Sequence, residues 1–383
     1  MQKIFFFLFL VICLSYSLAG QAPSSKPSSG FRIGGYAQID YNQPLGKGIK
    51  TNGVLDIHRL VTTMTYQFNA KTKFVSEVEF EHVKEVAIEQ AFLTYRLNRS
   101  INLKAGLVLI PMGLINLYHE PPSFNGVERP NLDKYIVPTT WREIGIGLTG
   151  NIQEMNIHYQ LYLVNGFRSY ANGQGMLRGV DGLRKGRQKG AESIVASPNI
   201  STRIDYYGLP NLKVGLSIYL GKTQSDLTNG ISKTDKIAQS RADSSIIGIS
   251  MLALDARYTI KKLMVKGQFI ASKLQNTAAY NAFTQKDLGA GLMGYYLEVA
   301  YNVLPKKQQT KLYPFIRYER YNTHQKVDEG IDVNPEYNRQ EITMGLTWKI
   351  ADGAVWKADY QFIKSKITPK FNYQLNLGVG VNF

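Results

Sequence analysis

From Phe31 to its last residue, the chain alternates apolar and polar side chains with a period of two. The final stretch, FNYQLNLGVGVNF, shows this most clearly, because every second residue from Phe371 to Phe383 is apolar or aromatic. This period is typical of β-strands with two chemically different faces. None of the segments carries a sustained helical pattern. About sixteen of them follow one another, beginning near Phe31, Val54, Thr72, Glu85, Ile101, Trp141, Glu154, Asn199, Leu212, Ile246, Lys262, Ala290, Lys311, Gln340, Val355 and Phe371.

The connections between these segments alternate between a short and a long class. NAK near Asn69 and ADG near Ala351 are short, whereas the connections after Ile110 and Asn165 run for about thirty residues. Two members of the long class, after His82 and Lys366, are also short. A soluble β-sandwich has no reason to sort its loops by parity, whereas an outer-membrane barrel has short periplasmic turns and longer extracellular loops.

The parity of the connections therefore predicts an all-β fold, a transmembrane antiparallel β-barrel of about 16 strands that starts and ends on the periplasmic side. Barrels of 16–18 strands leave an aqueous channel, whereas small ones are filled by their own side chains. The mean hydropathy of −0.20 agrees with such a barrel, since its lumen-facing half must be polar.

The N-terminus is typical of a secretory signal peptide. Lys3 precedes the apolar run IFFFLFLVICL and the small-residue stretch SYSLAGQA, which predicts a cleaved signal over residues 1–19, with cleavage after Ala22 as the alternative. A lipoprotein signal at Cys13 is the rival, but Ile12 stands where such signals need a small residue. We therefore expect a flexible leader over residues 20–30 and a single barrel domain over residues 31–383.

Charge and cysteine content narrow the partners. The only cysteine leaves with the signal peptide, which argues against a thiol nucleophile, a cysteine zinc site and disulfides. The formal net charge is +16, one unit lower after cleavage. A strongly basic exported protein is expected to meet anionic solutes or anionic lipid rather than nucleic acid.

The long connection after the fifth segment, about residues 111–140, is the candidate constriction loop. It opens with IPMG, which cannot continue a paired strand, and it is too long for a plain surface loop. As the third of the long connections, it is expected to fold into the lumen and narrow it, as in large diffusion porins. An ordered lid on the outer surface is the alternative. The candidate residues on it are His119, Glu120, Glu128, Arg129, Asp133 and Lys134.

Strand parity assigns the charged residues that line the lumen. The inward cations are Arg32, Arg59, Lys73, Arg96, Lys104, Arg203, Lys213, Arg257, Lys266, Arg317, Lys349 and Lys357. The inward anions are Asp40, Glu77, Glu79, Glu143, Asp205, Asp255, Glu298, Glu319, Glu341 and Asp359. Most are expected to pair into networks that stiffen the wall. The remaining imbalance is mildly positive, and Arg and Lys rings favour anions, so we expect weak anion preference.

The run LKAGLVLIPMG…YHEPPSFNGVERP…YIVPTTWREIGIGLTG resembles the phosphate-selective porin O/P family, particularly its relatives in Bacteroidetes-type bacteria. The opening FRIGGYAQIDY, the strand with HRLV and the strand IEQAFLTYRL add to the resemblance, which is mostly pattern outside residues 103–150. It implies a sixteen-stranded barrel, a homotrimer and passive diffusion of small hydrophilic solutes. The family's phosphate porins carry arginines on the inward loop, whereas this loop has only Arg129 and Lys134 before Arg142. Phosphate specificity is therefore an open question.

The fourth long connection, FRSYANGQGMLRGVDGLRKGRQKGAE, is rich in Arg and Lys. It gathers anions at the mouth, binds lipopolysaccharide phosphates, or is a solvated, mobile, Gly-rich loop. The last interpretation is the one that its composition favours.

Enzyme motifs are absent from the sequence, which contains no G-x-S-x-G, H-E-x-x-H or P-loop. The five histidines are scattered, so no metal site and no cofactor are predicted; they are His58, His82, His119, His158 and His324. The alternatives to a diffusion porin are a substrate-specific channel, an outer-membrane enzyme, and a structural or adhesive barrel with a plugged lumen.

The last strand carries an expected assembly signal. Its terminal aromatic, Phe383, with Tyr373 at the start of the strand, resembles the signal by which outer-membrane proteins are recognised. The sequence thus predicts localisation in a bacterial outer membrane, with outer-membrane lipid, lipopolysaccharide and the assembly machinery as partners.

Overall fold

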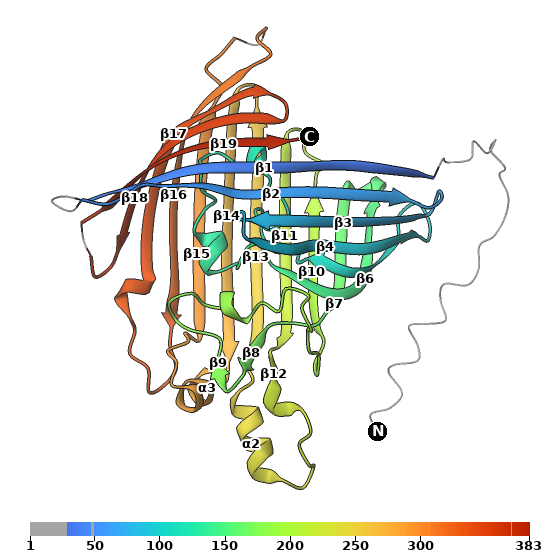
Figure 1. Ribbon diagram of the computed structural model, residues 1–383, viewed down its shortest axis with the longest axis vertical. Helices are drawn as coiled ribbons and strands as arrows, with labels where there is room; N and C mark the ends of the chain where they lie inside the picture. The colour runs from blue at the N-terminus through green and yellow to red at the C-terminus, as the bar shows by residue number, and fades with distance from the viewer. Residues whose placement is uncertain (1–28, 47–49, 306, 369) are drawn as a thin grey trace.

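Sixteen antiparallel strands close into one barrel, in which each strand pairs with its neighbours in chain order (Figure 1). The computed structural model describes residues 29–46, 50–305, 307–368 and 370–383, so the predicted signal peptide and nearly all of the leader lie outside the described residues. The barrel strands are β1 (Gly30–Leu45), β2 (Val54–Gln67), β3 (Thr72–Glu81), β4 (Glu85–Arg96), β5 (Asn102–Leu109), β6 (Arg142–Ile152), β7 (Ile157–Val164), β10 (Asn199–Tyr206), β11 (Leu212–Lys222), β13 (Gly248–Ile260), β14 (Leu263–Gln275), β15 (Gly291–Tyr301), β16 (Lys311–Lys326), β17 (Asn338–Ala351), β18 (Ala354–Ser365) and β19 (Asn372–Asn382). The prediction of a sixteen-stranded antiparallel barrel is confirmed.

The barrel closes between its first and last strands. β1 pairs with β19 from Tyr36 opposite Asn382 to Leu45 opposite Tyr373. Beyond this ladder, Gly35 and Phe383 exchange two backbone hydrogen bonds, each 2.9 Å long. The last residue is therefore held in the sheet, and the regular ending of the sequence is the strand that seals the barrel.

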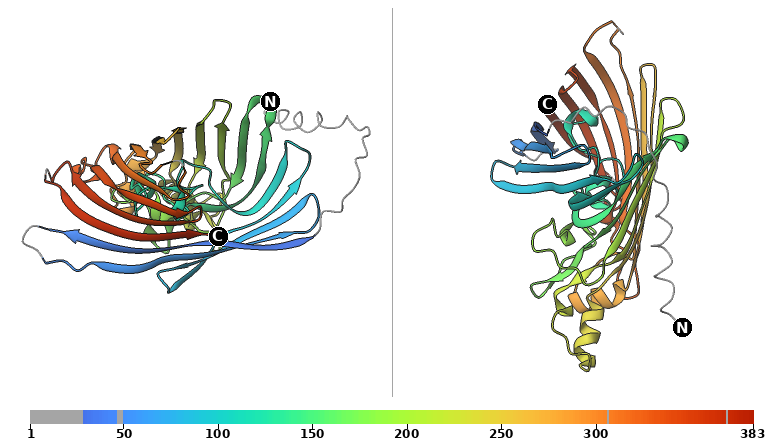
Figure 2. Two further views of the ribbon diagram at one scale, coloured as in Figure 1. Left: turned by 90° about the horizontal axis from the view of Figure 1, so that it is seen from above. Right: turned by 90° about the vertical axis from the view of Figure 1, so that its right-hand side faces the viewer.

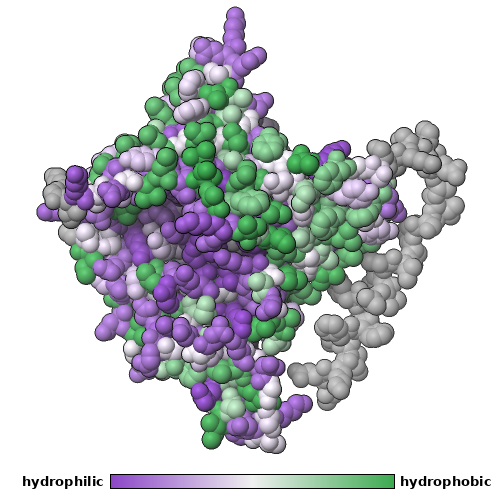
Figure 3. Space-filling model, viewed as in Figure 1, coloured by the Kyte–Doolittle hydropathy of each residue, from purple (hydrophilic) through white to green (hydrophobic). Residues whose placement is uncertain are grey.

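The two faces of each strand differ as the alternation predicts. On β7, Leu161 and Leu163 are exposed on the outside, whereas Tyr162 between them is 1% exposed. On β17, Met344, Leu346 and Trp348 are exposed outward in the same way. Figure 3 shows hydrophobic residues over the upper and right-hand parts of one face and hydrophilic residues gathered near its centre. Such an apolar outer band is the surface that a barrel presents to lipid.

Short helices and a second, small sheet lie in the long connections. The α-helices are α1 (Leu132–Tyr135), α2 (Lys236–Ser244) and α3 (Thr277–Thr284), and the 3-10 helices are η1 (Pro121–Ser123), η2 (Gln153–Met155), η3 (Arg184–Gly186), η4 (Asp226–Thr228) and η5 (Pro335–Tyr337). The small sheet has the order β12-β8-β9 and consists of β8 (Arg168–Ala171), β9 (Gln174–Gly175) and β12 (Gln224–Ser225). Sequence reasoning missed it because strands of two to four residues are too short to show a period. Within the described residues, no helix is long and apolar enough to cross a membrane.

One strand boundary differs from the prediction. β7 begins at Ile157 rather than near Glu154, because Gln153–Met155 form the 3-10 helix η2. Asn156 then takes a left-handed backbone conformation, with φ of 53°, which asparagine tolerates better than most residues. The apolar Met155 continues the alternation in the sequence, but it belongs to the turn.

Candidate functional site

Residues 110–141, here called the inner loop, connect β5 to β6 and lie inside the barrel. Pro111 has no N–H to continue the ladder, and the chain turns inward there. Asn116 closes the base of the loop, because its side-chain amide donates to the carbonyls of Ile110 and Trp141 and its oxygen accepts from the Trp141 N–H. Seen from above, loop segments occupy much of the ring formed by the strands (Figure 2).

One side of the barrel, formed by β10, β11 and β13–β18, holds the inner loop and is called the anchoring wall. Its carboxylates accept from the loop: Glu319 from the Leu132 N–H at 3.0 Å, Asp359 from the Val127 N–H at 2.5 Å, and Glu298 from the Asn125 amide at 2.9 Å. An irregular buried segment must satisfy its backbone groups outside a ladder. The charged side chains of the anchoring wall do this for the inner loop.

The cations of the anchoring wall are bound in the same network. Arg203 pairs with Asp205 at 2.6 Å and Asp255 at 2.7 Å. The other pairings lie along the loop: Arg317 with Glu298 and Glu319, Lys266 with the Ser123 carbonyl, Lys349 with the Pro122 carbonyl, Arg257 over the Tyr118 ring and Lys357 over the Phe124 ring. These charges stabilise the loop and are largely neutralised or covered.

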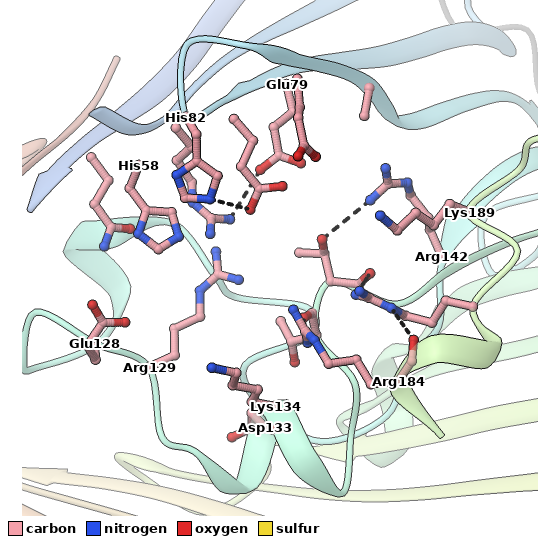
Figure 4. A pocket seen from close by; sticks show the side chains of 18 of the residues that line it. His58, Glu79, His82, Glu128, Arg129, Asp133, Lys134, Arg142, Arg184 and Lys189 are labelled. Atoms are coloured by element: carbon pink, nitrogen blue, oxygen red, sulfur yellow. Dashed lines mark hydrogen bonds and ion pairs between the residues drawn. The ribbon is translucent and has the colours of Figure 1, made fainter. Parts of the chain in front are cut away.

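A cavity of about 1150 Å³ lies on the other side of the inner loop (Figure 4). Strands β1–β5, here called the open wall, line one side of it, and the inner loop and residues 165–198, here called the fourth loop, face them. Acids predominate on the open wall, where Arg59 is the exception, and cations predominate on the opposite side, where Glu128 and Asp133 are the exceptions. The acids of the open wall are Asp40, Asp56, Glu79, Glu81 and Glu85, and the opposing cations are Arg129, Lys134, Arg142, Arg184, Arg187 and Lys189.

Three arginines that face the cavity, Arg129, Arg184 and Arg187, are held by carbonyls rather than by carboxylates. Arg129 donates to the His119 carbonyl at 3.1 Å, and Arg184 donates to the Thr139 carbonyl at 2.7 Å. Arg187 donates to the carbonyls of Pro138 at 3.0 Å and of Thr140 at 2.9 Å. Among the described residues, these three arginines form no ion pair within 4 Å.

Burial lowers the pKa of two of these arginines. The pKa of Arg129 falls to about 10, with the charge of Arg59 as the next cause, and the pKa of Arg187 falls to about 9, with Arg184 next. Both values lie above neutral pH, so both guanidinium groups stay charged. A carbonyl orients a guanidinium without cancelling its charge, and this side of the cavity therefore carries uncompensated positive charge.

Four of the six candidate residues of the constriction loop line the cavity: Glu128, Arg129, Asp133 and Lys134. His119 instead is buried, with Nε2 at 3.4 Å from a carboxylate oxygen of Glu89 on β4. Glu120 is half-buried and does not line the cavity. Burial raises the pKa of Asp133 to about 7, and its carboxyl accepts from Gln268 at 2.9 Å.

Strand parity assigned twelve cations to the lumen. Each of them lies on the face of its strand that carries buried residues. Only Arg59 among them lines the cavity, where it pairs with Glu79 at 3.3 Å. Lys104 lies over the Phe92 ring at 3.6 Å. In the described part of the chain, four of the twelve have no carboxylate within 4 Å and no aromatic face, and they are Arg32, Lys73, Arg96 and Lys213.

The cations that line the cavity from the fourth loop were missed as site residues. The expectation of a solvated loop is wrong for its middle, because Phe167, Leu177 and Leu183 are fully buried and Arg184 and Arg187 bond to the inner loop. The signal available in the sequence was the density of Arg and Lys in GLRKGRQKG. Arg142 carried no such signal, since it and Glu143 are both buried although they are adjacent in β6.

Comparisons with known proteins agree with this architecture. The family model described as phosphate-selective porin O and P matches residues 31–370. A protein of Aquifex aeolicus described as uncharacterized is 31% identical to the chain, over 89% of the chain and 78% of the relative.

Solved outer-membrane porins share the fold at low sequence identity. The outer-membrane channel DcaP of Acinetobacter baumannii matches with a TM-score of 0.59 and 11% identity, over 96% of this chain and 100% of that one. An anion-selective porin from Comamonas acidovorans matches with a TM-score of 0.57 and 13% identity, over 93% and 100%. The trimer form of OmpT of Vibrio cholerae matches with a TM-score of 0.55 and 12% identity, over 93% and 100%.

Proposed function

The chain belongs to the phosphate-selective porin O and P family, and from that premise we propose that it is a passive channel for small hydrophilic solutes with a preference for anions. Family membership makes it an outer-membrane porin and not an enzyme. The finer proposal, anion preference, depends on the charge distribution around the cavity.

One observation carries this proposal: Arg129, Arg184 and Arg187, which face the cavity from the inner and fourth loops, have carbonyl partners and no carboxylate within 4 Å among the described residues. Positive charges that line a narrow passage favour anions. One acid of the open wall is compensated, since Glu79 pairs with Arg59. The proposal places the selectivity in the two loops, where the five cations that line the cavity outnumber the two acids, Glu128 and Asp133.

The selectivity proposed is for small anions as a class rather than for phosphate alone. The inner loop itself supplies two cations, Arg129 and Lys134, and the fourth loop adds Arg184, Arg187 and Lys189. The positive charge that the inner loop lacks thus comes from the neighbouring loop. Arg184 and Arg187 are oriented by backbone carbonyls, so they attract an anion without forming a preset cage around one.

Reversal potentials in a planar bilayer with a KCl gradient test the proposal. We expect a reversal potential of the sign that shows Cl⁻ passing more readily than K⁺. A cation-selective or unselective channel would contradict the anion preference, and the absence of any conductance would contradict the channel itself. Adding phosphate to the KCl solution distinguishes the substrates, because a phosphate-specific channel loses Cl⁻ current sharply and a general one does not.

We also propose that the chain assembles as a homotrimer after removal of residues 1–19. The trimer form of the structurally similar OmpT supports the first part, and the apolar run after Lys3 supports the second. Mass measurement of the complex in detergent, together with N-terminal sequencing of protein purified from outer membranes, tests both. A monomer, or a mature chain that begins at Met1, would contradict them.

A further inference from the structure

Two histidines that are distant in the sequence lie side by side at the open wall. His58 is on β2 and His82 is in the turn between β3 and β4, and their rings are 5.4 Å apart between centroids. The His82 N–H donates to the His58 carbonyl at 3.2 Å, so the backbone fixes their proximity. The sequence argued against a metal site because the histidines are scattered, but the strand pairing brings these two together.

Two carboxylates converge on the same place. Asp40 on β1 lies with a carboxylate oxygen 2.7 Å from Nδ1 of His58, and Glu128 reaches the pair from the inner loop. One donor atom from each of Asp40, His58 and Glu128 lies within 4.8 Å of the other two. Zn²⁺ holds nitrogen and oxygen ligands at about 2.0–2.2 Å, so side-chain shifts on the order of 1 Å would bring these three donors onto one ion.

The surrounding groups orient these donors as the outer shell of a metal site does. The Gln38 amide donates to both Asp40 oxygens at 2.9 and 3.1 Å, and the Asn42 amide donates to Glu128 at 2.8 Å. His82 is paired with Asp56, which holds its ring beside that of His58. The amide oxygens of Gln38 and Asn42 are buried and have no hydrogen-bond partner among the residues that the structure describes. Both residues line the cavity, where water bound to an ion would have access to these acceptors.

We propose that Asp40, His58 and Glu128 bind a divalent transition-metal ion of the Zn²⁺ type. Imidazole with carboxylate suits Zn²⁺ rather than Mg²⁺, which prefers oxygen ligands alone. His58 would bind through the unprotonated Nδ1 and carry its proton on Nε2. The ion would link Glu128 of the inner loop to strands β1 and β2 across the cavity, so the site joins the loop to the open wall.

Isothermal titration calorimetry of the full-length purified protein in detergent with ZnCl₂ tests this assignment without any transport measurement. We expect one ion per chain for the wild type. His58→Ala and Glu128→Gln should each weaken binding by at least about 10-fold. The matched control is His158→Ala, since His158 lies on β7 and bonds to Asn151, away from the cluster. MgCl₂ should give no comparable binding.

Three outcomes would overturn the assignment. The first is a wild type that takes up no stoichiometric Zn²⁺, and the second is a His158→Ala variant that loses as much affinity as His58→Ala. The third is Glu128→Gln with unchanged affinity, which would show that the inner loop takes no part. Far-UV circular dichroism of each variant verifies that the barrel is intact, and Glu128→Gln keeps the result decisive if His58→Ala fails to fold.

Discussion

The anchoring wall and the open wall both carry charged residues on their inner faces, but they use them differently. On the anchoring wall, Arg203 and Arg317 are fully buried, each between two carboxylates, and their neighbours hold the backbone of the inner loop. On the open wall, contacts with the loop are fewer, among them Asn42 with Glu128 and Gln38 with the Val127 carbonyl. The cavity therefore lies on the side where the loop is held less.

This difference separates structural charge from functional charge within one barrel. A buried ion pair contributes little net stability compared with apolar packing, but removing one partner leaves an uncompensated charge. The anchoring wall is of this kind. The arginines opposite the open wall bond to backbone carbonyls or, for Arg142, to a hydroxyl, so removing their charge should change the field in the cavity more than the stability. The predictions below are ordered by their expected effect on stability.

The largest effect is expected from Arg317→Leu. This change leaves Glu319 buried without its cation and Glu298 with only Lys266 at 4.0 Å, and it removes the donors to the Asn125 and Glu128 carbonyls. We expect a loss of about 3–5 kcal/mol, measured as the free energy of unfolding in urea for protein refolded in detergent. Arg320→Leu is the matched control, since Arg320 is exposed on the opposite face of β16, and it should cost less than about 0.5 kcal/mol. Equal effects of the two variants would show that the buried pairs do not hold the loop.

The second largest effect on stability is expected at Asp133 of the inner loop, because burial raises the pKa of its carboxyl group from 3.8 to about 7. The unfolded chain releases this proton near pH 4 while the folded chain keeps it to about pH 7. The contribution of protonated Asp133 to the free energy of unfolding is therefore complete below about pH 4 and is lost as the pH rises towards 7. Asp133→Asn keeps the acceptor for Gln268 and should stabilise the protein at pH 8 by on the order of 4 kcal/mol.

Thermal unfolding in detergent at both pH values checks the sign of this effect. At pH 4 the wild-type side chain is neutral, so the variant should unfold at nearly the wild-type temperature, and this comparison serves as the internal control. A variant that is less stable at pH 8 than the wild type would show that ionised Asp133 is stabilised by the loop.

The sequence predicted the barrel but not the division between its walls. The period of two depends only on which face of a strand meets lipid, as the exposed Leu161 and the buried Tyr162 beside it show. The parity of the loops depends only on the end of the barrel at which each connection lies. Which lumen charge is neutralised depends instead on where the inner loop lies, and this is decided by contacts such as Glu319 with the Leu132 N–H, 187 residues apart. For the same reason the sequence assigned Arg317 and Arg59 alike to the cations that line the lumen, although only Arg59 lines the cavity. The approach of Arg184 to the inner loop follows from the folding of the fourth loop, which has no periodic signal.

An intermediate effect on stability is expected at the seam where β1 of the open wall pairs with β19. Deleting Phe383 removes its two backbone hydrogen bonds to Gly35, at a cost of about 2 kcal/mol. Phe383→Ala keeps these bonds and removes only the aromatic ring, so its refolded protein should unfold like the wild type. If the ring is an assembly signal, as we propose, Phe383→Ala should still lower the amount of assembled protein in outer membranes. Normal amounts would restrict the role of Phe383 to barrel closure.

The smallest effect on stability is expected where the functional effect is clearest, at Arg129 and Arg142. Arg129 makes one hydrogen bond to a carbonyl and Arg142 one long bond of 3.4 Å to the Thr140 hydroxyl, so Arg129→Gln with Arg142→Gln should cost about 1 kcal/mol. The double variant removes two positive charges from the cavity and should move the reversal potential in a KCl gradient towards cation selectivity. Arg178→Gln is the matched control, because Arg178 pairs with Asp181 outside the cavity. If Arg178→Gln moves the potential equally, net charge rather than the placement of charge determines selectivity, and the distinction between the two walls has no bearing on transport.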